Sequence, residues 1–202
     1  MSGINWDSYD VSEQPKTIKA KADVYKGIKF RSKLESKTAQ ALDTFGIPWE
    51  YEPKGYKLSN GLWYKPDFWL PVAHQYIECK GVMDEADIAK IMGLVNDTSY
   101  QVLALSYDNA MLFMKYWNES NADIVTYDEY LRFGRCSECG GKFIYCGMDT
   151  YQCTCCGEYD GDHHLGDYAD IESATQLFQY AQEIAANNPT YKEIAKAFNK
   201  EV

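Results

Sequence analysis

Hydrophobic and polar residues along the first third of the chain follow patterns typical of a hairpin, a helix and three strands. Residues 24–30 alternate around Gly27 and predict a short hairpin. Residues 32–45 place apolar side chains at helical spacing, with Ser32 at the N-cap position and Glu35 three residues later. Three strand-like runs follow, at residues 49–58, 62–70 and 74–79.

The pattern then changes to alternating helical and strand-like segments. Residues 84–95 and 109–117 have helical spacing, and the apolar run at 101–106 predicts a strand between them. Residues 123–126 predict a last short strand. This order predicts an α/β fold with a central mixed sheet flanked by helices.

The chain divides into four predicted segments. Residues 1–22 are polar and predict a loose N-terminal arm, and residues 23–132 hold the α/β core. The cysteine-rich residues 133–160 predict a small metal-binding module. Residues 161–202 predict a C-terminal helical segment with an apolar stripe. We expect this stripe to pack on the core, and a homodimer contact is the alternative.

Composition excludes several classes of protein. Of 202 residues, 46% are hydrophobic and 25% charged, which argues against global disorder. No run reaches the roughly 18 apolar residues that a membrane helix needs. The start of the chain lacks the basic flank and apolar core of a secretory signal, so we expect a cytoplasmic protein that does not engage a membrane.

Charge is distributed unevenly, with a net value of −10. The first 58 residues carry ten Lys and Arg against eight Asp and Glu, whereas the rest carry ten against 22. A nucleic-acid-binding face would therefore be built from the first third, because the acidic remainder repels polyanions. The candidates for DNA contact are Lys26, Lys29, Arg31, Lys33 and Lys37. The alternative is that they form a solvated surface.

Two carboxylates and a lysine fall on neighbouring predicted strands. Glu78 and Lys80 are two residues apart, so their side chains leave one face of a strand while Cys79 points to the core. A short connection at residues 71–75 makes this strand a neighbour of the one that holds Asp67. Asp67 and Glu78 are therefore expected to converge at one end of the sheet.

Desolvated carboxylates in contact require a proton or a cation between them. Hard oxygen ligands suit Mg²⁺, and a lysine beside a bound water can steer it and offset charge on a scissile phosphate. Glu35, on the preceding helix, would supply a third carboxylate from above the sheet edge. The alternative is a solvated salt-bridge ladder of Asp67, Glu78 and Lys80, which leaves Glu35 unexplained.

The motif Pro66-Asp67, ten intervening residues and then Glu78-Cys79-Lys80 resembles the PD-(D/E)XK nuclease superfamily. Glu35 matches the acidic residue that many members carry before the central hairpin. Residues 25–35 are similar to the entry of a small phage-associated nuclease-like family, with its G-x-x-F-x-S-x-x-E pattern. The resemblance covers about residues 23–106. It implies a restriction-endonuclease-like core in a protein encoded by a phage or mobile element, acting in the cytoplasm of a bacterial host.

The resemblance also implies an activity, the metal-dependent hydrolysis of DNA phosphodiester bonds. Asp67, Glu78 and the backbone carbonyl of Cys79 would hold Mg²⁺ or Mn²⁺, and Glu35 would bind the metal directly or through water. Lys80 would position the attacking water or help deprotonate it. The alternatives are a non-catalytic module that binds DNA or a protein on the same fold, such as a phage factor acting on a host complex, or a junction resolvase or RNA nuclease.

Six of the seven cysteines lie between residues 136 and 156, which in a cytoplasmic protein favours metal over disulfides. Two C-x-x-C pairs separated by thirteen residues predict a closed, structural Zn²⁺ site, a zinc ribbon. Cys155 and Cys146 are alternative ligands. We expect the ribbon to brace the chain or contact a partner protein, with a DNA contact as the alternative. The expected zinc ligands are Cys136, Cys139, Cys153 and Cys156.

Overall fold

The computed structural model describes most of the chain from residue 20 to residue 160. The described residues are 20–105, 110–115, 120–127, 131–136, 138–146, 151–153, 156 and 159–160. The predicted N-terminal arm lies almost entirely outside this set. The predicted C-terminal helical segment, 161–202, lies wholly outside it.

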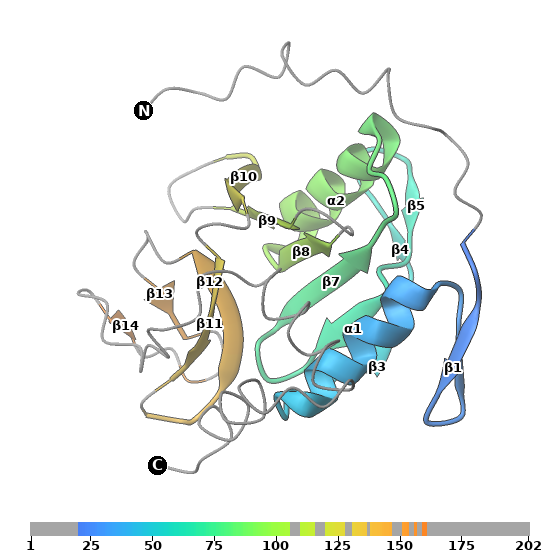
Figure 1. The fold of residues 1–202 in the computed structure, drawn as a ribbon. Helices are drawn as coiled ribbons and strands as arrows, with labels where there is room; N and C mark the ends of the chain where they lie inside the picture. The colour runs from blue at the N-terminus through green and yellow to red at the C-terminus, as the bar shows by residue number, and fades with distance from the viewer. Residues whose placement is uncertain are drawn as a thin grey trace.

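A six-stranded mixed sheet forms the centre of the α/β fold, as predicted (Figure 1). Its central strands β7 and β8 run parallel, and the other neighbouring pairs are antiparallel. The parallel pair requires a long crossover, which is provided by helix α2, Glu85–Thr98. Across the sheet the order is β10 (Asp123–Tyr127), β9 (Ala110–Met114), β8 (Gln101–Leu105), β7 (Gln75–Cys79), β6 (Phe68–Leu70) and β3 (Glu50–Tyr51).

Helix α1, Lys33–Thr44, begins at the predicted N-cap. The Ser32 hydroxyl accepts a hydrogen bond from the backbone N–H of Glu35 at 3.1 Å, which satisfies a donor of the first turn. The helix ends before Gly46, whose φ of 61° lies in the left-handed region that favours glycine. This capping fixes the position of Glu35 in the first turn, at the end of the helix where the candidate site lies.

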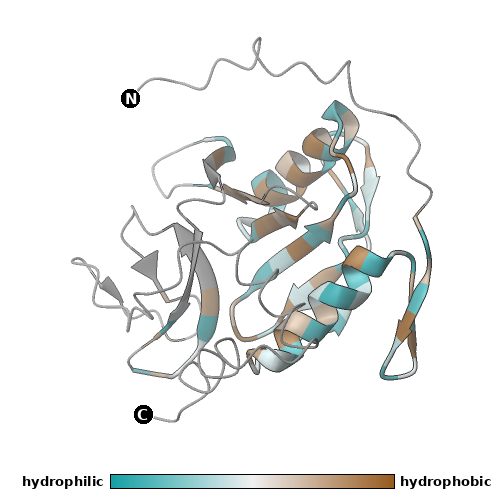
Figure 2. Cartoon of the chain, in the orientation of Figure 1, coloured by the Kyte–Doolittle hydropathy of each residue, from teal (hydrophilic) through white to brown (hydrophobic). Residues whose placement is uncertain are grey.

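The two helices cover opposite faces of the sheet, and each closes a separate hydrophobic core. Leu34 and Leu42 of α1 pack with Ile77 of β7, whereas Ile91 and Leu94 of α2 belong to the other core. Figure 2 shows hydrophobic residues on both helices and on the central strands between them. Neither helix, among the residues described, combines the length and the apolar character needed to cross a bilayer.

Short hairpins surround the sheet. The predicted hairpin at residues 24–30 is confirmed, and Lys26 and Gly27 form its turn with positive φ angles. Among the described residues, the two-stranded antiparallel pairs outside the six-stranded sheet join β1 (Asp23–Tyr25) with β2 (Ile28–Phe30), β4 (Tyr56–Lys57) with β5 (Trp63–Tyr64), β11 (Leu131–Arg135) with β12 (Lys142–Cys146), and β13 (Tyr151–Gln152) with β14 (Tyr159–Asp160).

Three predicted elements differ from the structure. The helix predicted at 109–117 is wrong, since its described part contains strand β9. Residues 110–113 are all buried because β9 lies between β8 and β10 with both faces covered, so its apolar run shows no alternation. The run at 49–58 forms two strands, because Glu52 adopts a left-handed φ of 46° and Pro53 follows it. The run at 62–70 likewise divides, at Pro66, into β5 and β6.

Candidate functional site

Three of the four predicted catalytic residues line one cavity of about 380 Å³. Glu35 comes from the first turn of α1, Asp67 immediately precedes β6, and Lys80 immediately follows β7. The fourth, Glu78, lies beside this cavity, with its Oε1 3.1 Å from the Nζ of Lys80. The antiparallel pairing of β6 and β7 brings Asp67 level with Glu78, as the short connection predicts.

The alternation of side chains along β7 also agrees with the prediction. Lys80 Nζ contacts both Glu78 and, at 3.2 Å, Oδ1 of Asp87 on helix α2. Cys79 points to the opposite face, where its Sγ lies 3.4 Å from the hydroxyl of Thr38 on α1. Glu78 and Lys80 therefore share the α2 side of the strand, and the thiol of Cys79 belongs to the core beneath α1.

Asp67 is held between a hydrogen-bond donor, a guanidinium and two other carboxylates. Its Oδ2 accepts from the backbone N–H of Cys79 at 2.8 Å, and its Oδ1 lies 2.6 Å from Arg31. Only 2% of the residue is exposed. Burial and the charges of Glu78 and Glu35 raise the pKa of Asp67 to about 7, against the opposing effect of the two donors.

Buried Glu78 and half-buried Lys80 form an ion pair, and a tyrosine supplies a further hydrogen bond to Glu78. The hydroxyl of Tyr64, on β5, donates to Glu78 Oε2 at 2.9 Å. Burial raises the pKa of Glu78, although Lys80 and Tyr64 oppose this. Burial lowers the pKa of Lys80, but the carboxylates of Glu78 and Asp87 outweigh it, so the net shift is upward. Lys80 therefore remains an ammonium group at neutral pH.

Glu35 is buried and hydrogen-bonded on the α1 side of the site. Its Oε2 accepts from the backbone N–H of Arg31 at 3.0 Å and from the hydroxyl of Tyr51 at 2.5 Å. Tyr51 lies on β3, the edge strand of the sheet. Burial and the carboxylate of Glu35 raise the pKa of Tyr51, so this phenol stays protonated as a donor.

Arg31, a predicted DNA contact, also contacts the acidic residues. Its guanidinium bridges Asp67 and, at 2.7 Å, Oε1 of Glu52. Glu52 also binds Lys65 at 2.6 Å. The carboxylates of this set belong to Glu35, Asp67, Glu78, Glu52 and Asp87, and the cations paired with them are Arg31, Lys65, Lys80 and Lys90. Five carboxylates against four cations leave an excess of acidic groups, which favours the binding of a cation.

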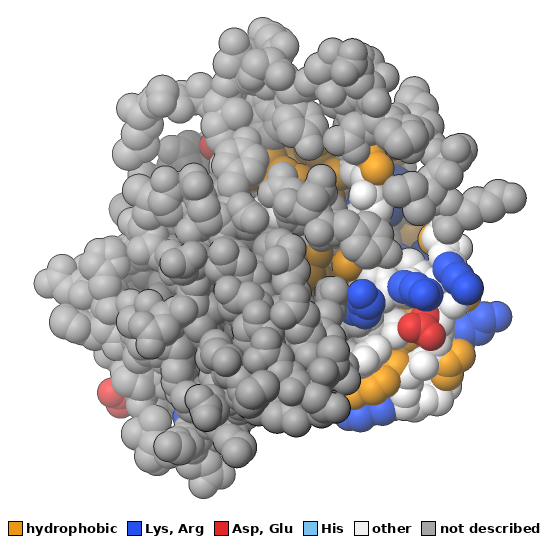
Figure 3. All heavy atoms as spheres, viewed as in Figure 1, with side chains coloured by type: hydrophobic (Ala, Val, Ile, Leu, Met, Phe, Trp, Pro, Cys, Tyr) orange, Lys and Arg blue, Asp and Glu red, His pale blue; other side chains and the backbone are white. Residues whose placement is uncertain are grey.

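The other predicted DNA contacts lie on β1–β2 and on α1. Lys29 and Lys33 are exposed and Lys37 is half-buried, while Lys26 pairs with Asp43 at 2.7 Å. Figure 3 shows Lys and Arg side chains gathered over the described surface of α1 and the β1–β2 hairpin. The basic surface of the first third therefore adjoins the end of α1 that carries Glu35.

The four predicted zinc ligands form a compact cluster. The Sγ atoms of Cys136, Cys139, Cys153 and Cys156 all lie within 4.8 Å of one another, and within the described part of the chain this is the one such group of potential metal ligands. Sγ separations of 3.7 Å and 3.6 Å match the roughly 3.8 Å between ligands at about 2.3 Å from a tetrahedral zinc. The alternative ligands, Cys155 and the side chain of Cys146, lie outside the described residues.

The cysteine cluster is attached to the α/β core. Cys136, Cys153 and Phe143 are buried in the same hydrophobic cluster as α1. Lys142 donates from its Nζ to the backbone carbonyl of Phe45, the C-cap residue of α1, at 2.7 Å. Four thiolates leave no open coordination position, so the cluster is consistent with a structural Zn²⁺ that braces this part of the chain.

Comparisons with known proteins leave the family open. No family model, no curated protein and no solved structure matches the chain. The evidence for the mixed sheet and the cysteine cluster therefore comes from the structure alone. Any catalytic function must be argued from the geometry of Glu35, Asp67, Glu78 and Lys80.

Sequence reasoning missed the side chains that hold the acidic residues in place. Tyr51, Tyr64, Glu52 and Asp87 contact the predicted site residues, and no motif singles them out. Tyr64 lies three residues before Asp67, and the sequence predicts it only as an aromatic residue of the sheet near the site, not as a hydrogen-bond donor to Glu78. A search for polar tips among the aromatic residues next to the motif would have found it.

Proposed function

We propose that this protein is a metal-dependent nuclease that hydrolyses DNA phosphodiester bonds on a restriction-endonuclease-like core. The observation that carries the proposal is the burial of Asp67 beside Glu78 at the end of two paired strands. Lys80 forms an ion pair with Glu78, and Glu35 lines the same cavity as Asp67 and Lys80. A buried carboxyl such as Asp67, whose pKa is raised by burial and by neighbouring carboxylates, favours a site for a cation.

The donor set fits a hard divalent cation. Asp67, Glu78 and the backbone carbonyl of Cys79 would hold Mg²⁺ or Mn²⁺, and Glu35 would join them directly or through water. A bound cation of this kind lowers the pKa of a water and offsets charge on a phosphate in the transition state. The excess of carboxylates over cations in this set is the property of the site that suits such an ion.

Lys80 acts as a cation in this proposal and not as a base. Its raised pKa keeps the ammonium protonated, so it can orient a water or a phosphate oxygen by donating hydrogen bonds. Tyr64 and Asp87 fix the positions of Glu78 and Lys80. Arg31 has an exposed side chain at the mouth of the cavity, where it can pass from Asp67 to a phosphate oxygen.

DNA would bind along the basic surface of α1 and the β1–β2 hairpin. Lys29 and Lys33 are exposed there, and Glu35 lies at the same end of α1. Contacts of this kind are electrostatic, so binding is expected to weaken steeply with salt. The zinc module would serve as a brace, and its attachment through Lys142 to α1 supports this role. The resemblance of the motif suggests a phage- or mobile-element-encoded enzyme.

The test is a cleavage assay with plasmid, single-stranded, four-way-junction and RNA substrates in Mg²⁺ or Mn²⁺. Lys80→Ala and Asp67→Asn are expected to lower the rate by about a hundredfold or more. Lys90→Ala is the matched control, because Lys90 also approaches Asp87, at 3.8 Å, but is not among the residues that line the cavity. Absence of cleavage on every substrate, or full activity in Asp67→Asn, would refute the proposal.

A second candidate is a DNA- or protein-binding module without catalysis. The ion pair between Arg31 and Asp67 favours it, since the guanidinium already neutralises the carboxylate that a metal would need. In that case Mg²⁺ would leave the stability of the protein unchanged, and Arg31→Ala would destabilise it. Preference for junctions or RNA in the same assay would instead identify a resolvase or an RNA nuclease.

A further inference from the structure

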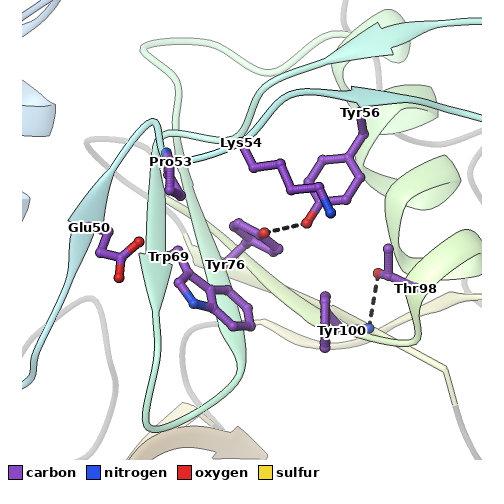
Figure 4. A pocket seen from close by; sticks show the side chains of 8 residues that line it. All are labelled: Glu50, Pro53, Lys54, Tyr56, Trp69, Tyr76, Thr98 and Tyr100. Carbon is purple, nitrogen blue, oxygen red and sulfur yellow. Dashed lines mark hydrogen bonds between the residues drawn. The ribbon is translucent and has the colours of Figure 1, made fainter.

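A second cavity, of about 450 Å³, opens on the α2 side of the sheet near the ends of β6 and β7 (Figure 4). Four of its eight lining residues are aromatic, and none of the eight also lines the acidic cavity. Lys54 and Glu50 stand at its edge as the charged groups. The aromatic residues are Tyr56, Trp69, Tyr76 and Tyr100.

These rings contact one another and form a preformed surface. The ring centroid of Trp69 lies 4.6 Å from that of Tyr76 and 5.0 Å from that of Tyr100. The hydroxyls of Tyr56 and Tyr76 are hydrogen-bonded, and His74 stacks behind Trp69 with an interplanar angle of 4°. Tyr100 is 37% exposed and Trp69 half-buried, and both line the cavity, so part of each side chain is accessible to a ligand.

The charges at the edge indicate which ligand fits. Lys54 places its Nζ 4.8 Å from the centroid of Tyr56, so the cavity already contains a cation against its aromatic wall. A second cation, such as a methylated lysine of a partner, would be repelled. A ligand with a flat π-system and a negative group would instead stack on the rings and pair with Lys54. Glu50, across the opening, can accept a hydrogen bond from an amino group.

We infer that this cavity binds one unpaired nucleotide of a DNA strand. Its base stacks on Trp69 and Tyr100, its phosphate pairs with Lys54, and an exocyclic amine donates to Glu50. The inference rests on the proposed function for the identity of the ligand as DNA. Trp69 and Tyr76 lie two residues from Asp67 and Glu78 along the same strands, about 7 Å, so the two sites adjoin. The substrate would then include an unpaired or frayed segment beside the scissile bond.

The test measures binding without cleavage, in the Asp67→Asn protein with no added Mg²⁺ or chelator. The probes are a short oligodeoxyadenylate, an abasic strand of the same length and the matching duplex. Their binding is measured by fluorescence anisotropy and by quenching of tryptophan fluorescence. The intact strand is expected to bind about tenfold or more tightly than the abasic strand. Trp69→Leu should remove this advantage and Trp69→Phe should keep most of it.

Matched variants separate stacking from charge and from misfolding. Trp63→Leu is the control, because Trp63 is 71% exposed on β5 and lines neither cavity. Lys54→Ala should weaken the intact and abasic strands alike and reduce the dependence on salt. If Trp69→Leu fails to fold, Tyr100→Ala, at a more exposed position, carries the same test and should narrow the gap between the two strands.

Equal affinity for intact and abasic strands, or unchanged binding in the variants of Trp69 and Tyr100, would overturn the inference. The two proposals fail separately. If strand binding depends on Trp69 but the protein cuts no DNA, the nucleotide site is supported and the nuclease proposal is refuted. If the protein cuts DNA but its strand binding does not depend on Trp69, the nuclease proposal is supported and the nucleotide site is refuted.

Discussion

Replacing Asp67 by Asn should change how the stability of the protein depends on pH. The folded protein binds a proton at this carboxyl with a pKa of about 7, whereas the reference value is 3.8. The folded state therefore holds the proton more tightly than the unfolded chain, and the free energy of unfolding falls as pH rises through this window. The difference between the two pKa values corresponds to a loss of roughly 4 kcal/mol in the free energy of unfolding as pH rises through both values, of which about 3 kcal/mol is lost between pH 5 and pH 8.

The assay is urea denaturation of the wild type and Asp67→Asn at pH 5 and pH 8, without divalent cations. Asn keeps an acceptor for the N–H of Cys79, so the comparison removes chiefly the charge. The wild type should lose free energy of unfolding from pH 5 to pH 8, and the variant should lose less. Asp97→Asn is the control, because hydrogen bonds from Ser59 lower the pKa of Asp97 and its titration lies below this window.

If the free energy of unfolding changed with pH by the same amount in the wild type and in Asp67→Asn, the reasoning would be refuted. A carboxyl with an ordinary pKa does not titrate between pH 5 and pH 8, so replacing it would leave the pH dependence unchanged. Added Mg²⁺ provides the second half of the test. If the cation binds as proposed, it should restore stability to the wild type at pH 8 and leave Asp67→Asn unchanged. Restoration of both proteins would place the metal elsewhere.

Three further predictions concern the rest of the chain. Cys136→Ser should lower the zinc content measured by atomic absorption and destabilise the protein, because it removes one of four clustered thiolates. Ser32→Ala should lower the free energy of unfolding by about 1 kcal/mol in urea titrations, since it removes the cap of α1. Gly93→Ala should lower the melting temperature, because the new Cβ would lie 2.7 Å from Nδ2 of Asn60 and 3.0 Å from Cδ1 of Leu58. A melting temperature equal to that of the wild type would contradict this last expectation.

Local signals predicted the elements whose boundaries depend on local chemistry. Ser32 and Glu35 fixed the start of α1, and Gly27 marked the turn of the first hairpin. Prediction failed where tertiary contacts decide the outcome. Strand β9 is buried on both sides by its neighbours, which removes the period-two pattern that distinguishes a strand from a helix.

The candidate site was predictable to the extent that strand geometry dictates it. The spacing of Glu78 and Lys80 and the short connection to Asp67 were enough to bring these side chains together. Tyr64 could have been proposed from its place next to the motif, but the contacts of Tyr51 and Tyr64 were not predictable, because both hydroxyls reach the site from other strands. Their positions depend on how the β3 and β4–β5 segments pack, and no local pattern encodes this.

The distribution of buried polar groups in the core argues for a functional site at this end of the sheet. On β7, Ile77 and Cys79 face one core and Tyr76 the other, as stability requires, but Glu78 interrupts the apolar pattern at only 3% exposure. Glu35 and Asp67 are equally buried, and each buried carboxylate costs stability even when paired. Apolar residues at these positions would give a more stable core. Such violations of the pattern are expected at functional sites, and here two of them, Glu35 and Asp67, line one cavity with Lys80, while the third, Glu78, pairs with that lysine.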